Sequence, residues 1–285
     1  MGYDLHVHTT ASDGRLTPDE VIEEAVSLRL EGLAITDHDT VLGLEPARRY
    51  IAENRVPLDL IPGIEMNTDV DRYDVHVLGY FIDYHNDQLI HRLLELREAR
   101  RERTLKMVRK LNGMGLNIKA DRVSELARGG LIGRPHIAQA LVEKNYVFSI
   151  PEAFEKLISR GKPGYVPRYK FLPEEAIRLI KGAGGVPVLA HPGLIGNDQL
   201  LEQLLPLGFE GIEVYYPEHS EAEIRKYHRL ARENALLVTG GSDYHGTPRV
   251  YHDELGGAEA TREQVDLLRQ RALEHKNKNI GQEGR

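Results

Sequence analysis

The chain has 285 residues, no cysteine and a formal net charge of −7. Its length suits one barrel-sized domain or two smaller ones, and the absence of cysteine excludes disulfides and thiolate metal sites. The negative charge argues against a broad polyanion-binding surface, although it allows a local basic groove. We expect a soluble, cytoplasmic protein without a signal peptide, because no apolar run approaches the roughly 18 residues that span a bilayer.

Short apolar runs alternate with helical patterns along the chain, as in parallel α/β folds. The expected strands cover residues 3–8, 33–36, 58–65, 75–80, 186–190, 211–215 and 236–240. Helices are expected from residue 18 and over 45–54, 173–183, 199–205, 220–234 and 261–274. The first begins at Thr17-Pro18-Asp19-Glu20, which supplies an N-cap hydroxyl, a proline and a capping-box glutamate.

The middle third of the chain breaks this alternation. Residues 86–167 show several helical patterns and little that resembles a buried parallel strand. We interpret this stretch as a helical insertion between two halves of one barrel, within a single domain that spans residues 1–285. The expected fold class is therefore α/β, a barrel with a mostly helical insertion.

Histidines and carboxylates recur where the expected strands end. His6 and His8 alternate on the first strand with Asp13 in the next turn, Asp37-His38-Asp39 follows the second strand, Glu65 ends the third, His191 follows the fifth, and Asp243 and His245 follow the last. The carboxyl ends of parallel strands open to one mouth, so these side chains should meet there. Each residue alone could instead be a rim residue or an Asx turn, but their joint recurrence favours a metal centre. His76 lies near the start of its strand, so the pattern leaves its direction open.

The same residues resemble successive motifs of the PHP (polymerase and histidinol phosphatase) phosphoesterases. The matching segments are His6-x-His8 with Asp13, Thr36-Asp37-His38-Asp39, Gly63-Ile64-Glu65, Ala190-His191-Pro192 and Gly241-Ser242-Asp243-x-His245. The resemblance implies a distorted (β/α)7 barrel with a trinuclear metal site. By the same resemblance, His6, His8, Glu65 and Asp243 would hold one ion, Glu65, His76 and His191 a second, and Asp13, His38 and His245 a third. Asp37 would orient a ligand imidazole.

The implied ions are three divalent cations, with manganese preferred and iron or zinc as alternatives. They would contribute about +6 and the carboxylates of Asp13, Glu65 and Asp243 about −3, which leaves a site near +3. Such a site suits a phosphate ester better than a neutral amide. A water or hydroxide held between two ions would then attack phosphorus in line.

Substrate recognition should come from outside the metal ligands. Arg134 and His136 at the start of an expected helix, and Lys162 in a Gly/Pro-rich basic loop, are candidate phosphate contacts, although solvated surface charge is an equal alternative. Tyr215 and His219 follow the sixth strand and could contact a base, or could simply pack at the rim. The basic segment 97–110 is either a solvated helix face or a nucleic-acid backbone contact.

The insertion and the Gly-Arg-Pro-His-Ile-Ala stretch resemble one PHP subgroup in particular, which acts on 3′,5′-nucleotide bisphosphates and on short RNA from its 5′ end. The resemblance implies a phosphoesterase that removes the 3′-phosphate of 3′,5′-bisphosphonucleosides, or a 5′-to-3′ exoribonuclease on short 5′-phosphorylated RNA. A histidinol-phosphatase-like phosphomonoesterase is the main alternative, but such members generally lack the insertion. An amidohydrolase and a binding module with a vestigial site are further alternatives. The expected partner is a nucleotide or short RNA, with no membrane and no obligatory protein partner.

Overall fold

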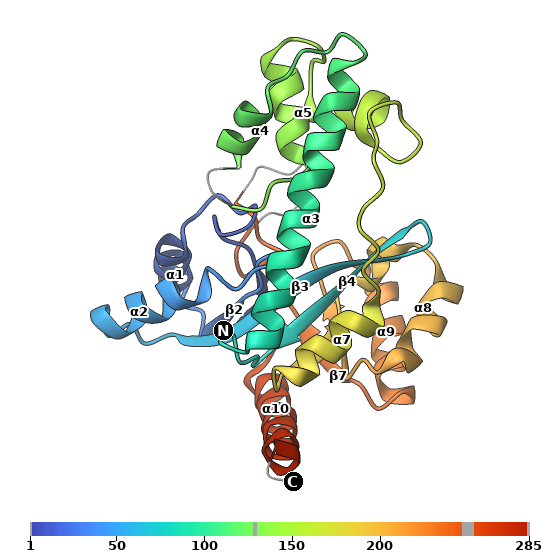
Figure 1. Cartoon of the computed structure of the whole chain (residues 1–285). Helices are drawn as coiled ribbons and strands as arrows, with labels where there is room; N and C mark the ends of the chain where they lie inside the picture. The colour runs from blue at the N-terminus through green and yellow to red at the C-terminus, as the bar shows by residue number, and fades with distance from the viewer. Residues whose placement is uncertain (1, 128–129, 247–253, 284–285) are drawn as a thin grey trace. The chain divides into compact units, whose positions relative to one another are not determined.

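The computed structural model describes residues 2–127, 130–246 and 254–283 (Figure 1). The chain forms two compact units. Met1–His91 and Phe171–Arg285 make up the first, which we call the barrel unit, and Arg92–Lys170 make up the second, the helical unit. Organisation as one domain with an insertion at 86–167 stays a prediction.

Seven strands form one sheet in the barrel unit, in the order in which they occur in the chain. They are β1 (Tyr3–Val7), β2 (Gly32–Ile35), β3 (Asp59–Val70), β4 (Tyr73–Tyr80), β5 (Val186–Leu189), β6 (Gly211–Tyr215) and β7 (Leu237–Gly240). A parallel bridge between Val7 and Tyr244 links β1 to the chain that follows β7, so the sheet nearly closes. The expected α/β barrel is confirmed.

One strand runs against the other six. β4 pairs antiparallel with both β3 and β5, whereas every other pair of neighbouring strands is parallel. β3 continues to Val70, beyond its expected end at residue 65, and turns into β4 through Asp71, which has a positive φ of 54°. The start of β4 therefore lies at the end of the barrel where the parallel strands finish, which settles the direction that the sequence left open.

Helices cover the outside of the barrel. They are α1 (Pro18–Ser27), α2 (Leu44–Asn54), α7 (Pro173–Gly182), α8 (Asp198–Leu204), α9 (Glu221–Glu233) and α10 (Arg262–Glu283), with two short 3₁₀ helices, η2 (Pro192–Ile195) and η3 (Leu205–Leu207). α1 begins with the expected capping box, in which the Thr17 hydroxyl accepts a hydrogen bond from Glu20 N and the Glu20 carboxylate binds Thr17 N. This reciprocal pairing satisfies backbone donors that a helix start otherwise leaves open.

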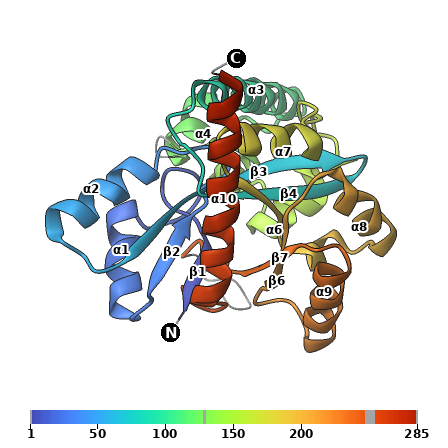
Figure 2. The same cartoon turned by 90° about the horizontal axis from the view of Figure 1, so that it is seen from below.

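α10 closes the end of the barrel at which the parallel strands begin (Figure 2). Its side chains bind residues that precede or start four strands: Arg262 binds Glu31, Arg269 binds Asp59, Arg271 binds Glu210, and His275 binds the carbonyl of Gly185. Its apolar face, with Val265 and Leu268, packs into a core that includes Leu5 of β1 and Val188 of β5. The helix extends well past the expected end at residue 274. In the described part of the chain, α10 therefore covers the end of the barrel that lies opposite the carboxyl ends of the parallel strands.

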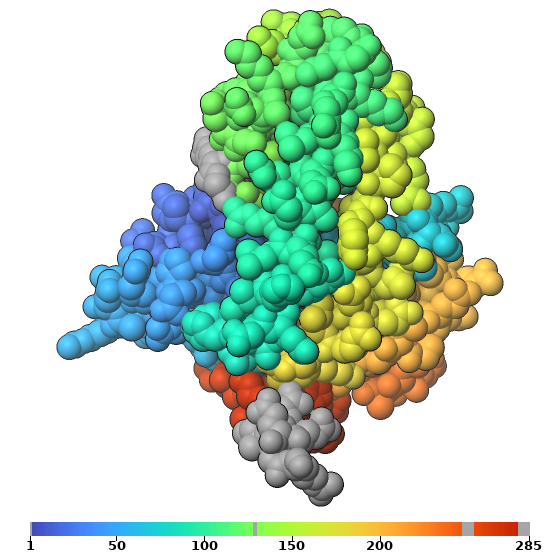
Figure 3. Space-filling view, viewed as in Figure 1, coloured from blue at the N-terminus to red at the C-terminus, as the bar shows by residue number. Residues whose placement is uncertain are grey.

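The helical unit has a hydrophobic core of its own. Its elements are most of α3 (Asp87–Asn112), then α4 (Ala120–Leu126), α5 (Arg134–Glu143), α6 (Ile150–Ala153) and a π-helix, η1 (Phe154–Ile158). Leu111, Ile137 and Leu141 lie at the centre of the core, while the side chains of α3 also reach the molecular surface (Figure 3). Within the described residues of this unit no strand forms. No helix in the described part of the chain is long and apolar enough to cross a membrane.

Candidate metal centre

Nine histidine, aspartate and glutamate side chains come together at the open end of the barrel. They are His6 and His8 around the end of β1, Asp13 in the loop that follows, His38 after β2, Glu65 on β3, His76 on β4, His191 after β5, and Asp243 and His245 after β7. All nine are residues that the sequence analysis singles out. The carboxyl ends of the parallel strands and the first half of the antiparallel β4 bring them to one mouth.

Glu65 is the centre of this arrangement and is fully buried. Its Oε1 lies 2.7 Å from His76 Nδ1 and 3.1 Å from His191 Nε2. Its Oε2 faces three further imidazoles, at 2.8 Å from His38 Nδ1, 3.2 Å from His8 Nε2 and 3.3 Å from His6 Nε2. One carboxylate thus faces five imidazoles from four different segments of the chain.

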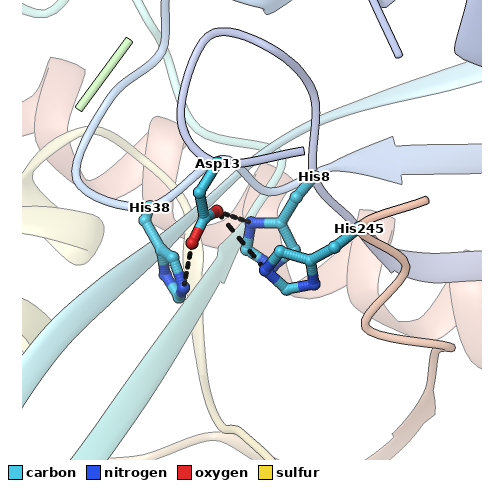
Figure 4. A group of neighbouring side chains, drawn as sticks. All are labelled: His8, Asp13, His38 and His245. Atoms are coloured by element: carbon cyan, nitrogen blue, oxygen red, sulfur yellow. Dashed lines mark ion pairs between the residues drawn. The ribbon is translucent and has the colours of Figure 1, made fainter. Parts of the chain in front are cut away.

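Asp13 gathers a second group (Figure 4). Its Oδ1 lies 3.3 Å from His245 Nε2 and 3.8 Å from His8 Nδ1, and its Oδ2 lies 3.9 Å from His38 Nε2. In the close-up all three imidazoles point toward the carboxylate, although they come from different ends of the chain. His8 is therefore shared, because its other nitrogen faces Glu65.

Asp243 completes the centre from the end of β7. Its Oδ1 lies 3.1 Å from His8 Nε2 and 3.5 Å from His6 Nε2, while Tyr216 donates a hydrogen bond of 3.1 Å to Oδ2. Asp243 has a φ of 53° and His191 a φ of 24°, a backbone region that non-glycine residues seldom adopt. Backbone strain of this kind concentrates at functional sites.

Gly241 allows the close approach of β7 to β1. A Cβ at this position would lie 2.4 Å from both the backbone nitrogen and the Cβ of His6. No real side chain fits at that distance, so only glycine lets the segment that carries Asp243 lie beside His6.

The three carboxylates of the centre remain ionised. Burial raises the pKa of Glu65, but His38, His76 and His6 lower it by more and hold it well below its usual value. The pKa values of Asp13 and Asp243 are likewise held well below the usual range, because the neighbouring imidazoles outweigh the effect of burial. Several ionised carboxylates buried this close together are unfavourable unless positively charged groups or metal ions neutralise them.

The donor set fits divalent metal ions. In the described part of the chain, several buried atoms of these side chains make no hydrogen bond: His6 Nε2, both ring nitrogens of His8, His38 Nδ1, Glu65 Oε2, Asp13 Oδ1 and His191 Nδ1. Each such atom costs about 1–3 kcal/mol unless another partner satisfies it. Imidazole and carboxylate donors without sulfur are typical ligands of manganese, iron or zinc.

Three groups of these residues have ligand atoms within 4.8 Å of one another. They are His6, His8, Glu65 and Asp243; His8, Asp13, His38 and His245; and His38, Glu65 and His76. The first equals the set that the family resemblance implies for one ion, and the second contains the set implied for the third. In the last group His38 stands where the resemblance places His191. The distribution of ligands among ions stays a prediction.

Glu213, in the middle of β6, is a functional residue that the sequence analysis missed. It is fully buried, its Oε1 lies 3.0 Å from His6 Nδ1, and its Oε2 accepts a hydrogen bond of 2.7 Å from His191 N. A carboxylate can only accept here, so His6 Nδ1 carries a proton, and the neutral ring would present the lone pair of Nε2 to a metal ion. The sequence feature that could have indicated Glu213 is its charge, because it lies between the apolar residues Ile212 and Val214 in an expected strand.

Asp4 was also missed, although it too interrupts an apolar strand. Burial raises its pKa to about 6, against hydrogen bonds from Ser242, Gly256 and His6 that act in the other direction. The backbone nitrogens of all three residues donate to its carboxylate, as does the Ser242 hydroxyl. Asp4 therefore ties the start of β1 to the segment after β7, next to Asp243.

The Asp37 carboxylate binds the loop that carries Asp13, and its expected role in orienting a ligand imidazole stays a prediction. Its Oδ1 accepts hydrogen bonds from Thr9 N at 2.8 Å and from the Ser12 hydroxyl at 2.6 Å, and its Oδ2 accepts one from the Thr9 hydroxyl at 2.8 Å. These donors belong to the loop that carries Asp13. Asp37 therefore fixes the loop that carries Asp13.

The two rim residues proposed for base contact have other partners. The Tyr215 hydroxyl lies 2.9 Å from Nε2 of His228, which is on α9. His219 Nδ1 donates to the Val214 carbonyl at 2.9 Å, and its Nε2 accepts from Gly193 N at 3.1 Å. Both ring nitrogens of His219 thus bind backbone groups, and a base contact by Tyr215 or His219 stays a prediction. The neighbouring Tyr216 is the aromatic residue that reaches the centre.

The candidate phosphate contacts lie in the helical unit. Arg134 is the first residue of α5, and its guanidinium lies over the Phe154 ring at 5.5 Å. His136 Nδ1 accepts a hydrogen bond from Gly133 N at 3.1 Å, and Lys162 is exposed. Their role in phosphate binding stays a prediction.

Comparisons with known proteins agree with this geometry. The family model described as the PHP domain matches residues 4–165. The 5′-3′ exoribonuclease Rnm of Escherichia coli is 37% identical over 248 residues, which cover 85% of each chain. The 3′,5′-nucleoside bisphosphate phosphatase of Chromobacterium violaceum is 36% identical over 248 residues, which cover 85% of this chain and 86% of that one.

A solved structure provides a third comparison. A candidate metal-dependent phosphoesterase from Bifidobacterium adolescentis superposes with a TM-score of 0.84 at 33% identity, over 95% of this chain and 96% of that one. The family model covers more than half of the present chain, and the identities extend across both units. The chain belongs to the PHP domain family.

Proposed function

We propose that this protein is a metal-dependent phosphoesterase that hydrolyses nucleotide phosphates. Its substrates would be 3′,5′-bisphosphonucleosides, from which it removes the 3′-phosphate, or short 5′-phosphorylated RNA, which it degrades in the 5′-to-3′ direction. The observation that carries the proposal is the convergence of six imidazoles and three carboxylates at the mouth of the barrel. The names of the two relatives described above support the choice of a nucleotide or RNA substrate.

We further propose that the nine converging residues bind three divalent ions, with manganese preferred. The carboxylates of Glu65 and Asp243 and the imidazoles of His6 and His8 would form one site, as their mutual distances support. Asp13, His38 and His245 would form another, and His76 and His191 would complete the third together with Glu65. Bound ions would supply a nucleophilic water and neutralise charge on a phosphate. A cytoplasmic location stays a prediction.

The protein's own residues have distinct tasks in this chemistry. Glu213 keeps the proton of His6 on Nδ1, so that Nε2 always faces the centre. Tyr216 and Asp4 hold the segment that carries Asp243, and Asp37 holds the loop that carries Asp13. Ligands fixed in this way lose little entropy when a charged substrate binds, which favours a precise geometry for attack on phosphorus.

Turnover of defined substrates tests the proposal. The manganese-loaded protein should release phosphate from adenosine 3′,5′-bisphosphate or nucleotides from 5′-phosphorylated RNA, and chelation of the metal should abolish both activities. Glu65→Gln removes the carboxylate at the centre and should abolish turnover, whereas Glu218→Gln changes an exposed glutamate and should not. Failure on both substrates with rapid hydrolysis of histidinol phosphate would support the phosphomonoesterase alternative. Metal-dependent hydrolysis of an amide alone would support an amidohydrolase.

A further inference from the structure

Asn67 on β3 lies next to the metal centre but is not one of its expected ligands. β3 and β4 pair without a break, and in this register Asn67 stands opposite His76. Residues two apart on a strand face the same side of the sheet. Asn67 therefore faces the side that Glu65 faces, about 7 Å farther toward the open end of the barrel. Its side chain is the next polar group of β3 beyond the ligands.

Asp39 fixes the orientation of this side chain. Its carboxylate accepts two hydrogen bonds from the same residue, from Asn67 N to Oδ1 at 2.9 Å and from Asn67 Nδ2 to Oδ2 at 3.1 Å. Asp39 is itself buried, and its backbone nitrogen donates a hydrogen bond of 2.8 Å to the Glu65 carbonyl. Because a carboxylate can only accept here, the amide group cannot turn over, and its oxygen points away from Asp39.

The amide oxygen of Asn67, Oδ1, is an acceptor without a partner. In the described part of the chain, the hydrogen bonds of this side chain all use Nδ2. Only 9% of the residue is exposed, so solvent reaches the side chain poorly, and an unpaired oxygen there is unfavourable. Polar groups that are oriented in advance and face a site in this way are typical contacts of a ligand.

The charge around Asn67 selects the kind of group that can bind its oxygen. The Asp39 carboxylate lies within hydrogen-bond distance of the amide, and Asp69 is the next residue on the same face of β3. A phosphate oxygen only accepts, and carboxylates repel it, so a phosphate does not fit at this position. The bond from Nδ2 to a carboxylate also polarises the amide, which makes Oδ1 a better acceptor. A neutral donor, such as a hydroxyl group, fits.

We propose that Asn67 binds the ribose 2′-hydroxyl of the substrate and thereby selects ribonucleotides over deoxyribonucleotides. The inference rests on the proposed function. Removal of a 3′-phosphate breaks the bond between phosphorus and O3′, and so does release of a nucleotide that keeps its 5′-phosphate. In both reactions the 2′-hydroxyl is on the neighbouring carbon atom, so it stays beside the centre, whereas the amino group of a base lies farther away. The 2′-hydroxyl is also the group by which proteins distinguish RNA from DNA.

Matched substrates test this inference on the full chain. We would compare adenosine 3′,5′-bisphosphate with its 2′-deoxy and 2′-fluoro-2′-deoxy forms, since fluorine is electronegative like the hydroxyl but cannot donate a hydrogen bond. The measured quantity is the preference for the ribose form, both in kcat/KM with manganese and in affinity for the metal-free chain in a chelating buffer. Asn67→Ala removes the acceptor, and Asp39→Asn removes the group that orients it. Asn54→Ala changes an exposed asparagine on α2 and is the control.

The wild-type chain should prefer the ribose form about tenfold over both analogues, because each analogue leaves the nearly buried Oδ1 unpaired. Asn67→Ala should abolish this preference, Asp39→Asn should reduce it because the amide can then turn over, and Asn54→Ala should retain it. A purely structural role of Asn67 would instead lower turnover of all three compounds equally. No preference in the wild type, or an undiminished preference in Asn67→Ala, would overturn the inference. A tenfold preference in affinity without any turnover would contradict the proposed function alone.

Discussion

The Glu213→Gln substitution tests how this centre controls a ligand through a neighbouring residue. Glu213 receives two donors, His6 Nδ1 at 3.0 Å and His191 N at 2.7 Å, in a position with no solvent exposure. Glutamine has only one acceptor oxygen, so one donor would face an amide NH₂ group. If that donor is His6, its proton moves to Nε2, and this nitrogen can no longer bind a metal ion.

The expected size of the effect follows from those two contacts. Loss of one hydrogen bond to a buried charge costs about 1.5–3 kcal/mol, which corresponds to about 10–100-fold in metal affinity at 1.36 kcal/mol per factor of ten. Competition with a chromogenic chelator measures the manganese affinity, and ¹⁵N chemical shifts of the His6 ring report its tautomer in the metal-free chain at a pH at which the ring is neutral. Both readouts should change in Glu213→Gln.

Two further variants make the result decisive. Glu218→Gln changes an exposed glutamate and should leave both readouts at their wild-type values. Glu213→Asp keeps the charge but shortens the side chain, so it should weaken manganese binding by less than Glu213→Gln. Wild-type affinity and an unchanged tautomer in a folded Glu213→Gln protein would refute the reasoning.

Three further substitutions probe other contacts. Tyr216→Phe removes the donor to Asp243 Oδ2 and should weaken manganese binding about tenfold in the same competition assay. Asp37→Asn replaces a buried acceptor and should lower the free energy of unfolding by about 1–3 kcal/mol in metal-free urea titrations. Glu210→Gln should lower it by about 1 kcal/mol above pH 5. The pKa of Glu210 is lowered because Lys181 and Arg271 outweigh burial, so this difference should vanish as the pH falls below 4.5.

Each of these expectations has an outcome that contradicts it. Unchanged manganese affinity in Tyr216→Phe would show that Asp243 keeps its position without the phenol. Wild-type unfolding of Asp37→Asn would show that the loop carrying Asp13 is held elsewhere. A stability difference for Glu210→Gln that grows toward acid pH would reverse the sign argued from its contacts with α7 and α10.

Much of the barrel and its mouth could be predicted from the sequence, because both depend on local patterns. Short apolar runs mark the strands, and a polar residue at the end of a run marks the mouth. Asp13 and His38 lie far from His245 in the sequence. The three residues nevertheless meet in the structure, because each of them follows the end of a strand. The lengths of β3 and α10 were underestimated, since long-range pairing rather than local propensity extends them.

The residues that support the ligands could not be predicted in the same way. Glu213 and Asp4 lie inside strands, where a single charged residue gives no indication of its partner. The loop donors that bind Asp37 could not be predicted either, because sequence spacing does not show which donors surround a carboxylate.

The antiparallel direction of β4 determines whether His76 belongs to the centre. On one side of β4, His76 pairs with Asn67, two residues from Glu65. On the other side, its carbonyl accepts a hydrogen bond of 3.1 Å from Ala190 N, which places His191 next in line. Because β4 and β5 are antiparallel, Ala190 lies beside the residue that precedes Val77, which is His76. In a parallel pair, Ala190 would instead lie beside a residue that follows Val77. A shift of one residue in this register would turn His76 to the opposite face of the sheet, away from Glu65. The hairpin that joins β3 to β4 is therefore as necessary to the metal centre as the ligands themselves.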